Sequence, residues 1–295
     1  EMFLVVDEAH HATAKTYRNL IENLKRSVPI VKIIGLTATP FRTLDAEKGL
    51  LSKIFTDGLV DGRPVRGESG IAYQIGLQDL INRQILSRPF IETCETDEVY
   101  GQDLGAKEIE SMQRLDSIPD KVANQMVESS SRNRLIVDAY VNNQDKYGQT
   151  ILFAVNIAHA VTLKTLLNNA GVAADIVVSQ LRDDDTGRMR TRAENQQAID
   201  GYIKGEIKVL INVNILTEGV DLPKTKSVFL ARPTSSTILM TQMIGRGLRG
   251  VKAGGTAESY IVSFVDGWDE RVAWTSPETL FSGNNQFNDE DRKER

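Results

Sequence analysis

Mostly apolar runs of strand length recur along the chain, and segments with helical apolar spacing lie between several of them. The runs lie at residues 2–6, 30–34, 150–155, 172–178, 207–212 and 227–231. Continuous rather than alternating hydrophobicity is typical of parallel strands that are buried on both faces, and parallel strands need long, usually helical, connections. The sequence therefore predicts an α/β fold with parallel sheets and flanking helices.

Length and composition fit one or two soluble globular domains. The chain has 295 residues, of which 41% are apolar and 25% charged, and its formal net charge is −5. This charge argues against a polybasic binder, although a local basic groove could still hold phosphates. A single cysteine, Cys94, excludes an internal disulfide framework and a multi-cysteine zinc site. The three histidines lack the spacing of a structural metal site.

Nothing in the sequence predicts contact with a membrane. No apolar run approaches the roughly 18–20 residues that a spanning helix needs. The start, EMFLVVDEAHH, also lacks the basic region and cleavage site of a signal peptide. We therefore expect a cytoplasmic protein.

Two acidic residues follow the first apolar run directly. Asp7 and Glu8 come after Met2–Val6 and are followed by Ala9 and His10. Ligands of open α/β sheets bind outside the carboxyl ends of the strands, where these acids would lie. Carboxylate oxygens suit Mg²⁺, and hydrolysis needs an oriented water molecule. The alternative is a pair of solvated acids at a strand end.

A second group of functional candidates lies in the stretch 230–250. If this stretch is helical, Gln242, Arg246 and Arg249 share one face because they lie at i, i+4 and i+7. Guanidinium groups stay charged and offer forked donors, which suit a phosphoryl group in its transition state. The alternative is a solvated basic helix end.

Four short motifs occur in a fixed order along the chain. They are DEAH at 7–10, TATP at 37–40, TEGVDLP at 217–223 and QMIGRGLR at 242–249. In this order the motifs, over residues 1 to about 265, resemble those of superfamily 2 helicases and translocases. The resemblance implies two RecA-like domains, of which the first is truncated at its N-terminus. The expected parts are the first domain at 1–90, the second at 91–275 and a polar tail at 276–295.

In the first domain, the resemblance implies a nucleotide site that uses ATP and Mg²⁺. Asp7 and Glu8 would hold the metal, and Glu8 would also polarise the attacking water. His10 would belong to the nucleotide site. Thr37 and Thr39 would couple hydrolysis to movement on the nucleic acid.

In the second domain, the resemblance implies two groups of residues. Gly219 and Asp221 would contact the nucleotide, and Asp221 would orient the arginines. Gln242, Arg246 and Arg249 would act as catalytic sensor and arginine fingers. The expected contacts to the nucleic-acid backbone come from three polar residues, Asn156, Ser179 and Thr217.

The stretch that follows TEGVDLP, RPTSSTILMTQMIGRGLRG, is most similar to the group that contains XPB-like and type III restriction motors. Members of this group act on DNA, so the resemblance implies DNA rather than RNA as the partner. It also leaves room for protein partners in a repair or defence complex.

One expected part of the motor is not found in the chain. The phosphate-binding pattern GxxxxGK[ST] does not occur in it. We therefore expect the chain as given to be a piece of a larger motor and to be inactive alone. Two alternatives remain open. The chain could be a non-hydrolysing nucleic-acid-binding or regulatory module, or it could belong to the motor subunit of a restriction or phage-defence complex.

Three further polar residues are expected to lie at the surface. The apolar spacing of 121–142 predicts a helix with Arg132 and Arg134 solvated, a contact with a phosphate backbone being the alternative. His159 is expected at the surface or at a helix cap.

Overall fold

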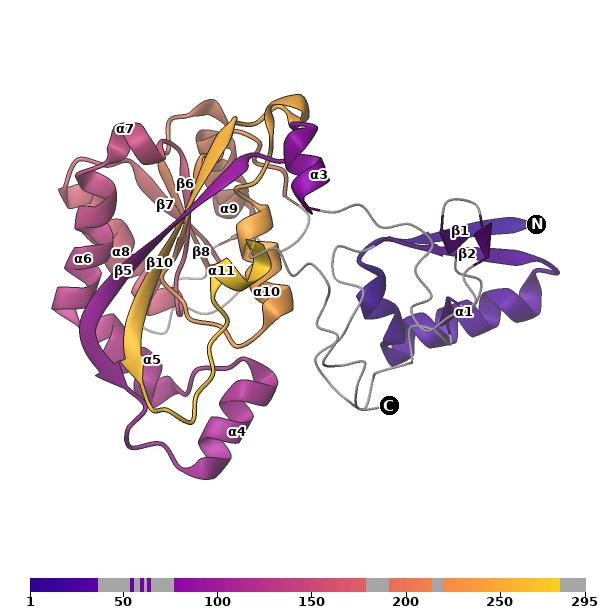
Figure 1. Ribbon diagram of the computed structural model, residues 1–295, viewed down its shortest axis with the longest axis horizontal. Coiled ribbons are helices and arrows are strands. Elements are labelled where there is room, and N and C mark those ends of the chain that lie inside the picture. Colours follow the sequence, from indigo (N-terminus) through magenta and orange to yellow (C-terminus); the bar gives the residue numbers. More distant parts are fainter. Residues whose placement is uncertain are drawn as a thin grey trace. The chain divides into compact units, whose positions relative to one another are not determined.

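The computed structural model describes residues 1–36, 54–55, 59–60, 63–64, 77–178, 191–213 and 220–281. The chain divides into two compact units, Glu1–Gly76 and Leu77–Arg295 (Figure 1). The division comes earlier in the chain than the domain boundary near residue 90 that the sequence indicates. In the structure the strand that contains residue 90, β5 (Arg88–Tyr100), pairs along most of its length with a strand of the second unit.

The first unit contains a pair of parallel strands, β1 (Met2–Val6) and β2 (Val31–Gly35). Between them lie a 3-10 helix, η1 (Ala9–Thr13), and helix α1 (Lys15–Ser27). Two short strands, β3 (Leu59–Val60) and β4 (Arg63–Pro64), form an antiparallel pair. The parallel pairing and its helical connection agree with the predicted α/β fold.

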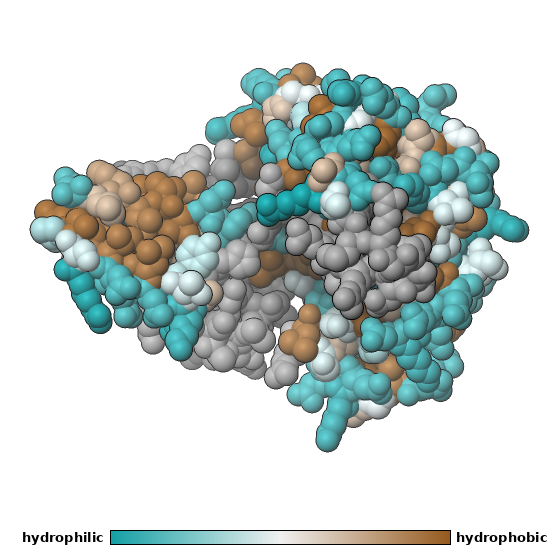
Figure 2. All heavy atoms as spheres, turned by 180° about the vertical axis from the view of Figure 1, so that it is seen from behind, coloured by the Kyte–Doolittle hydropathy of each residue, from teal (hydrophilic) through white to brown (hydrophobic). Residues whose placement is uncertain are grey.

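The burial predicted for the first apolar run is found at its last residue alone. Val6 is buried, whereas the side chains of Phe3 and Val5 are exposed. In the described part of the chain, β1 pairs with β2 alone, and its side chains alternate toward the protein and toward solvent at positions 3–6. Phe3 and Val5 of β1 and Leu20 of α1 are exposed apolar side chains. Figure 2 shows an apolar surface on the first unit.

The second unit is built on a six-stranded sheet in which every pair of neighbouring strands is parallel. The strand order is β5-β10-β9-β6-β8-β7. Besides β5, the strands are β6 (Thr150–Phe153), β7 (Ala174–Val178), β8 (Val209–Val213), β9 (Ser227–Leu230) and β10 (Glu258–Trp268). The predicted parallel sheet is thus confirmed.

Helices lie before, between and after these strands. They are α3 (Leu77–Asn82), α4 (Ala106–Leu115), α5 (Asp120–Glu128), α6 (Ser130–Val141), α7 (Gln144–Tyr147), α8 (Ile157–Asn169), α9 (Arg192–Lys204), α10 (Thr237–Gly245), the 3-10 helix η3 (Val251–Ala253) and α11 (Pro277–Phe281). α11 packs on α10, so this part of the expected polar tail is folded. No helix in the described ranges is long and apolar enough to cross a membrane.

The sheet separates two hydrophobic cores, with α6 and α8 on one face and α9 and α10 on the other (Figure 1). Successive residues of one strand point to opposite faces, so Leu152 packs with α6 and α8, while Ile151 packs with α9 and α10. A third cluster lies under α4 and α5 and includes Met112 and Met126, with Trp268 and Trp274 packed against it. These layers fix the carboxyl end of β6, beyond which Asn156 lies, and the amino ends of β5 and β10, near which Arg249 lies.

Candidate nucleotide and nucleic-acid sites

Asp7 and Glu8 lie directly after the last residue of β1, at the carboxyl end of the strand. The backbone N–H of Glu8 donates to Oδ1 of Asp7 at 2.9 Å. Glu8 has a φ of 46°, in the left-handed region that non-glycine residues seldom adopt. Such a conformation costs free energy and is often kept at functional sites. His10 follows in η1.

The end of β2 lies beside this acidic turn. Leu36 donates its N–H to the carbonyl of Val6 at 2.9 Å, and its own carbonyl accepts from Ala9 at 2.9 Å. Gly35 is needed for this approach, because a Cβ at this position would lie 2.8 Å from the Cβ of Ala9. The backbone that leads into the TATP motif is therefore held against the DEAH motif. Thr37 and Thr39 themselves lie outside the described residues.

The two carboxylates fit a metal that is bound together with a nucleotide. In the described part of the chain, no group of three or more His, Cys, Asp or Glu residues could hold a metal ion. Mg²⁺ usually keeps several waters and is bound through one or two carboxylates together with substrate phosphates. The adjacent Asp7 and Glu8 supply such carboxylates at a strand end, where ligands of α/β sheets bind.

In the second unit, α10 carries one of the three motif residues and ends before the others. The hydroxyl of Ser236 caps the helix by accepting the N–H of Leu239 at 3.2 Å. Gln242 lies within the helix, Arg246 is its C-cap, and Arg249 lies beyond it. The prediction that one helix carries all three residues is therefore wrong.

Glycine explains why the helix stops. Gly245 and Gly247 weaken it, since glycine costs about 1 kcal/mol relative to alanine in a helix. Gly250 lies so close to residues 84–86 that a Cβ there would be 2.4 Å from the carbonyl oxygen of Gln84. Arg249 forms an antiparallel bridge with Leu86 in place of a further helical turn.

The two arginines converge on one short segment, Val220–Asp221. Nη1 of Arg246 donates to the carbonyl of Val220 at 2.6 Å. Nε of Arg249 donates to Oδ1 of Asp221 at 3.1 Å. The side chains of Arg249 and Asp221 are 41% and 67% exposed, so both groups remain accessible to a ligand. Such an exposed pair contributes little to stability. Thr217 and Gly219 lie outside the described residues.

Asn156 lies beyond the carboxyl end of β6, at the start of α8. Its Oδ1 accepts the N–H of His159 at 2.8 Å, which makes it the N-cap. Helix N-termini favour anions because their N–H groups and dipole carry partial positive charge. Ser179 follows β7 and lies outside the described residues.

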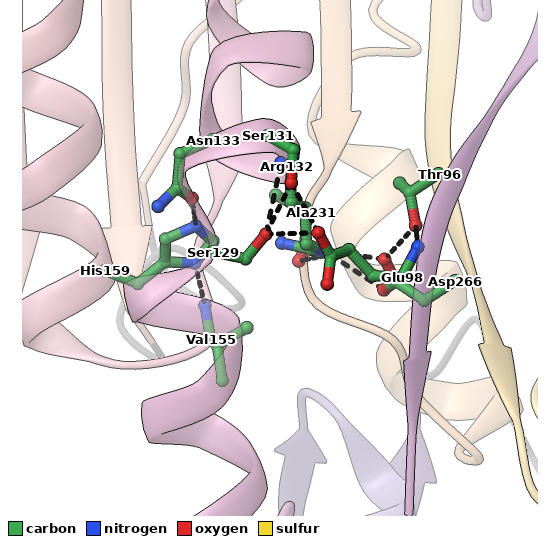
Figure 3. A network of polar contacts seen from close by, with 10 residues as sticks. All are labelled: Thr96, Glu98, Ser129, Ser131, Arg132, Asn133, Val155, His159, Ala231 and Asp266. Carbon is green, nitrogen blue, oxygen red and sulfur yellow. Dashed lines mark hydrogen bonds and ion pairs between the residues drawn. The ribbon is translucent and has the colours of Figure 1, made fainter.

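His159 anchors this turn from within the protein (Figure 3). Its ring is fully buried, contrary to the expected surface position. The N–H of Val155 donates to Nδ1 at 3.3 Å, and Nε2 lies 2.9 Å from Oδ1 of Asn133. Burial, helped by the positive charge of Arg132, lowers the pKa of His159 to about 3. The ring is therefore neutral at ordinary pH, with its proton on Nε2.

Arg132 is also buried, where a solvated side chain is expected from the sequence. Its Nε and Nη2 donate to the two oxygens of Asp266 at 2.8 and 3.0 Å (Figure 3). Nη2 also donates to the carbonyl of Ala231 at 2.8 Å, and Thr96 donates to Asp266 at 2.7 Å. A carboxylate with this bidentate geometry makes the burial of a guanidinium tolerable. No rule of sequence spacing could have predicted this ion pair, because Arg132 and Asp266 lie 134 residues apart.

Sequence patterns also did not predict a polar group around Asp116. Oδ1 of Asp116 accepts from Oγ1 of Thr234 at 2.8 Å and from the N–H of Ser235 at 2.7 Å. Oδ2 accepts from Arg232 at 3.1 Å. Burial lowers the pKa of Arg232, and the charge of Asp116 opposes this effect. The contacts hold the loop that leads into α10 and so help to place the arginine-bearing stretch.

Comparison with known proteins shows which families the chain resembles. Residues 131–251 match the helicase conserved C-terminal domain, and residues 1–42 match the type III restriction enzyme res subunit. IRC3 of Saccharomyces cerevisiae, described as a candidate ATP-dependent helicase, is 29% identical over 250 residues. This match covers 83% of the chain and 32% of IRC3. The Schizosaccharomyces pombe irc3, described as a candidate mitochondrial ATP-dependent helicase, is 27% identical over 270 residues, covering 89% of the chain and 38% of the relative.

A solved structure supports the fold. The fragment of a candidate HsdR subunit of a type I restriction enzyme from Vibrio vulnificus aligns with a TM-score of 0.55 at 19% identity. The alignment covers 98% of this chain and 45% of that one. The parallel α/β arrangement is that of RecA-like helicase domains.

Within that class, the chain is similar to superfamily 2 motors, and its first residues are similar to the type III restriction enzymes. It spans about a third of the length of the two curated relatives described above.

Proposed function

We propose that the protein containing this chain couples ATP hydrolysis to translocation along DNA or to its unwinding. The observation that carries the proposal is the convergence of Arg246 and Arg249 on Val220–Asp221. It brings two guanidinium groups of the QMIGRGLR motif to the TEGVDLP motif, and both side chains remain partly accessible. Two such groups suit the charge of a phosphoryl group in transfer.

The residues of the first unit would bind the metal and orient the water. Bound ATP and Mg²⁺ would supply the phosphoryl group and neutralise its charge. Asp7 and Glu8 would hold the metal, and Glu8 would orient the attacking water. The turn that places Glu8 in the left-handed region sets its carboxylate at the strand end, and His10 would lie within the same site.

The residues of the second unit would stabilise the charge that develops during transfer. Gln242, Arg246 and Arg249 would donate to the phosphate oxygens. Asp221 would hold Arg249 in position and, with Gly219, contact the nucleotide. The accessible ion pair supports this role, because Asp221 can hold the guanidinium while the other donors of Arg249 remain available.

The nucleic acid would be held by residues that follow the strands of the second sheet. Asn156 caps α8 at the end of β6, where an anion is favoured. Ser179 and Thr217 complete the proposed set. Thr37 and Thr39 follow Leu36, whose backbone is hydrogen-bonded to Val6 and Ala9. They would couple hydrolysis to the grip on the strand.

The preference for DNA over RNA rests on the similarity to restriction enzymes. Residues 1–42 match a restriction-enzyme family, and restriction enzymes act on DNA. The same similarity supports protein partners in a repair or defence complex.

The test is ATP hydrolysis by the protein at its natural full length, with duplex DNA, single-stranded DNA or RNA. We expect one of the DNA forms to stimulate turnover more than RNA does. Greater stimulation by RNA would overturn the choice of DNA. A protein that binds nucleic acid but shows no ATP turnover with any of the three would favour a non-hydrolysing binding module.

A further inference from the structure

The segment 84–88, which connects α3 to β5, lies along the stretch that contains Arg249. Four backbone hydrogen bonds join them, with lengths of 2.9 to 3.0 Å. They run from Ser87 to Leu248, from Gly250 to Ile85, from Lys252 to Gln84 and from Arg88 to Ala257. The position of Arg249 therefore depends on a segment that is distant in sequence.

Ser87 lies at the centre of this pairing and is fully buried. Its Oγ lies 2.7 Å from the carbonyl oxygen of Arg249 and 2.8 Å from that of Thr256. A hydroxyl has one proton, so the two carbonyls share it. The N–H of Thr256 also donates to the carbonyl of Arg249 at 2.9 Å. Ser87 thus closes a turn with Arg249 at one end and Thr256 at the other.

Two glycines make this fit possible and leave little room for the backbone to move. A Cβ on Gly255 would lie 1.9 Å from the carbonyl oxygen of Arg249, and one on Gly250 would lie 2.4 Å from that of Gln84. The carbonyl group of Arg249 is thus enclosed by Ser87, Gly255 and Thr256. Its side chain extends toward Asp221.

We propose that Ser87 is a positioning residue for Arg249, which acts by fixing the backbone from which the guanidinium reaches the phosphoryl group. The inference rests on the proposed function, because it assumes that Arg249 contacts the nucleotide. Asp221 directs the end of the side chain, and Ser87 directs its base. Catalytic groups must be placed precisely, since a displacement of about 1 Å can cost on the order of 100-fold in rate.

The experiment compares Ser87→Ala with wild type in the full-length protein, by measuring nucleic-acid-stimulated ATP hydrolysis. We expect kcat to fall by about 10- to 100-fold, while KM for ATP changes by less than about threefold, because the contact is needed mainly in the transition state. Ser227→Ala is the matched control. Ser227 is equally buried, and its hydroxyl pairs with that of Thr150 rather than with a carbonyl of the Arg249 stretch. We expect its kcat to stay near that of wild type.

A double variant distinguishes a positioning role of Ser87 from a nonspecific effect on the packing of the second unit. If Ser87 acts through Arg249, adding Ser87→Ala to Arg249→Ala lowers kcat no further. An equal loss of kcat in Ser87→Ala and Ser227→Ala would overturn the inference, and so would full additivity in the double variant. Wild-type kcat in Arg249→Ala would instead refute the proposed site, and the inference with it. If Ser87→Ala does not fold, Ser87→Cys keeps a side chain of similar shape with a weaker donor and replaces it in the same comparisons.

Discussion

Arg249 and Asp221 form an ion pair with an Nε–Oδ1 distance of 3.1 Å, although 28 positions separate them in the chain. Arg249 is not part of the helix that carries Gln242, so this pair and the backbone contacts of Arg249 set the direction of its side chain. The pair joins the TEGVDLP and QMIGRGLR motifs within the second unit. It is the contact on which the proposed chemistry depends most directly.

Loss of the guanidinium at position 249 should lower ATP turnover strongly. We expect Arg249→Ala to reduce kcat of the full-length protein by on the order of 10³-fold or more, as for an arginine finger. Asp221→Asn should have a smaller effect, since the guanidinium remains but is held less firmly. Arg271→Ala is the control, because Arg271 is also half-exposed and paired with an acid, Asp269. Turnover that falls equally in Arg249→Ala and Arg271→Ala would contradict the assignment.

Glu8→Gln should separate nucleotide binding from hydrolysis. The amide preserves the size of the side chain but cannot polarise water as a carboxylate does. We expect kcat to fall by on the order of 10²–10⁴-fold, while a fluorescent ATP analogue still binds. Glu22→Gln, on the exposed face of α1, should leave both quantities unchanged. Wild-type hydrolysis by Glu8→Gln would show that another group orients the water.

Asp266→Asn should destabilise the second unit, because it leaves Arg132 as a buried cation with a neutral partner. Breaking a buried pair typically costs about 3–5 kcal/mol. The chain's two tryptophans, Trp268 and Trp274, lie in this unit, so urea unfolding followed by fluorescence reports on it. Asp103→Asn removes one partner of an exposed pair with Lys121 and should cost about 0–1 kcal/mol. Equal costs for the two variants would show that burial of the Arg132–Asp266 pair is not what stabilises the unit.

The buried His159 should make the second unit less stable in mild acid. Its pKa is about 3 in the folded protein, below the ordinary 6.5, so the unfolded chain binds the extra proton first. The contribution of neutral His159 to the free energy of unfolding is complete above pH 6.5, and it is lost progressively as the pH falls toward 3. Between pH 7.5 and 5.5 this loss of stability amounts to about 1 kcal/mol. Urea unfolding at the two pH values should show a smaller difference for His159→Gln than for wild type. An unchanged difference would assign the pH dependence to other groups.

Much of the architecture could be predicted because its signals are local. A strand-length apolar run followed by Asp7 and Glu8 predicts a parallel strand with acids at its carboxyl end, and β1 agrees. The motifs predict the family, since their order along the chain is a property of the sequence alone. The partnership of Asp221 with Arg249 also followed from the family resemblance.

What the sequence determined by itself is the α/β class, the parallel strands and the identity of the motif residues, because these depend on residue type and short-range spacing. The glycines at 245 and 247 weaken α10, but only the tertiary structure decided that pairing with residues 84–88 takes the place of a further helical turn. It also decided that Arg132 and His159 are buried, since Asp266 and Asn133 reach them only through the packing of the sheet and its helices. Helical periodicity cannot report such contacts, because they depend on which strands are neighbours and in what register they pair.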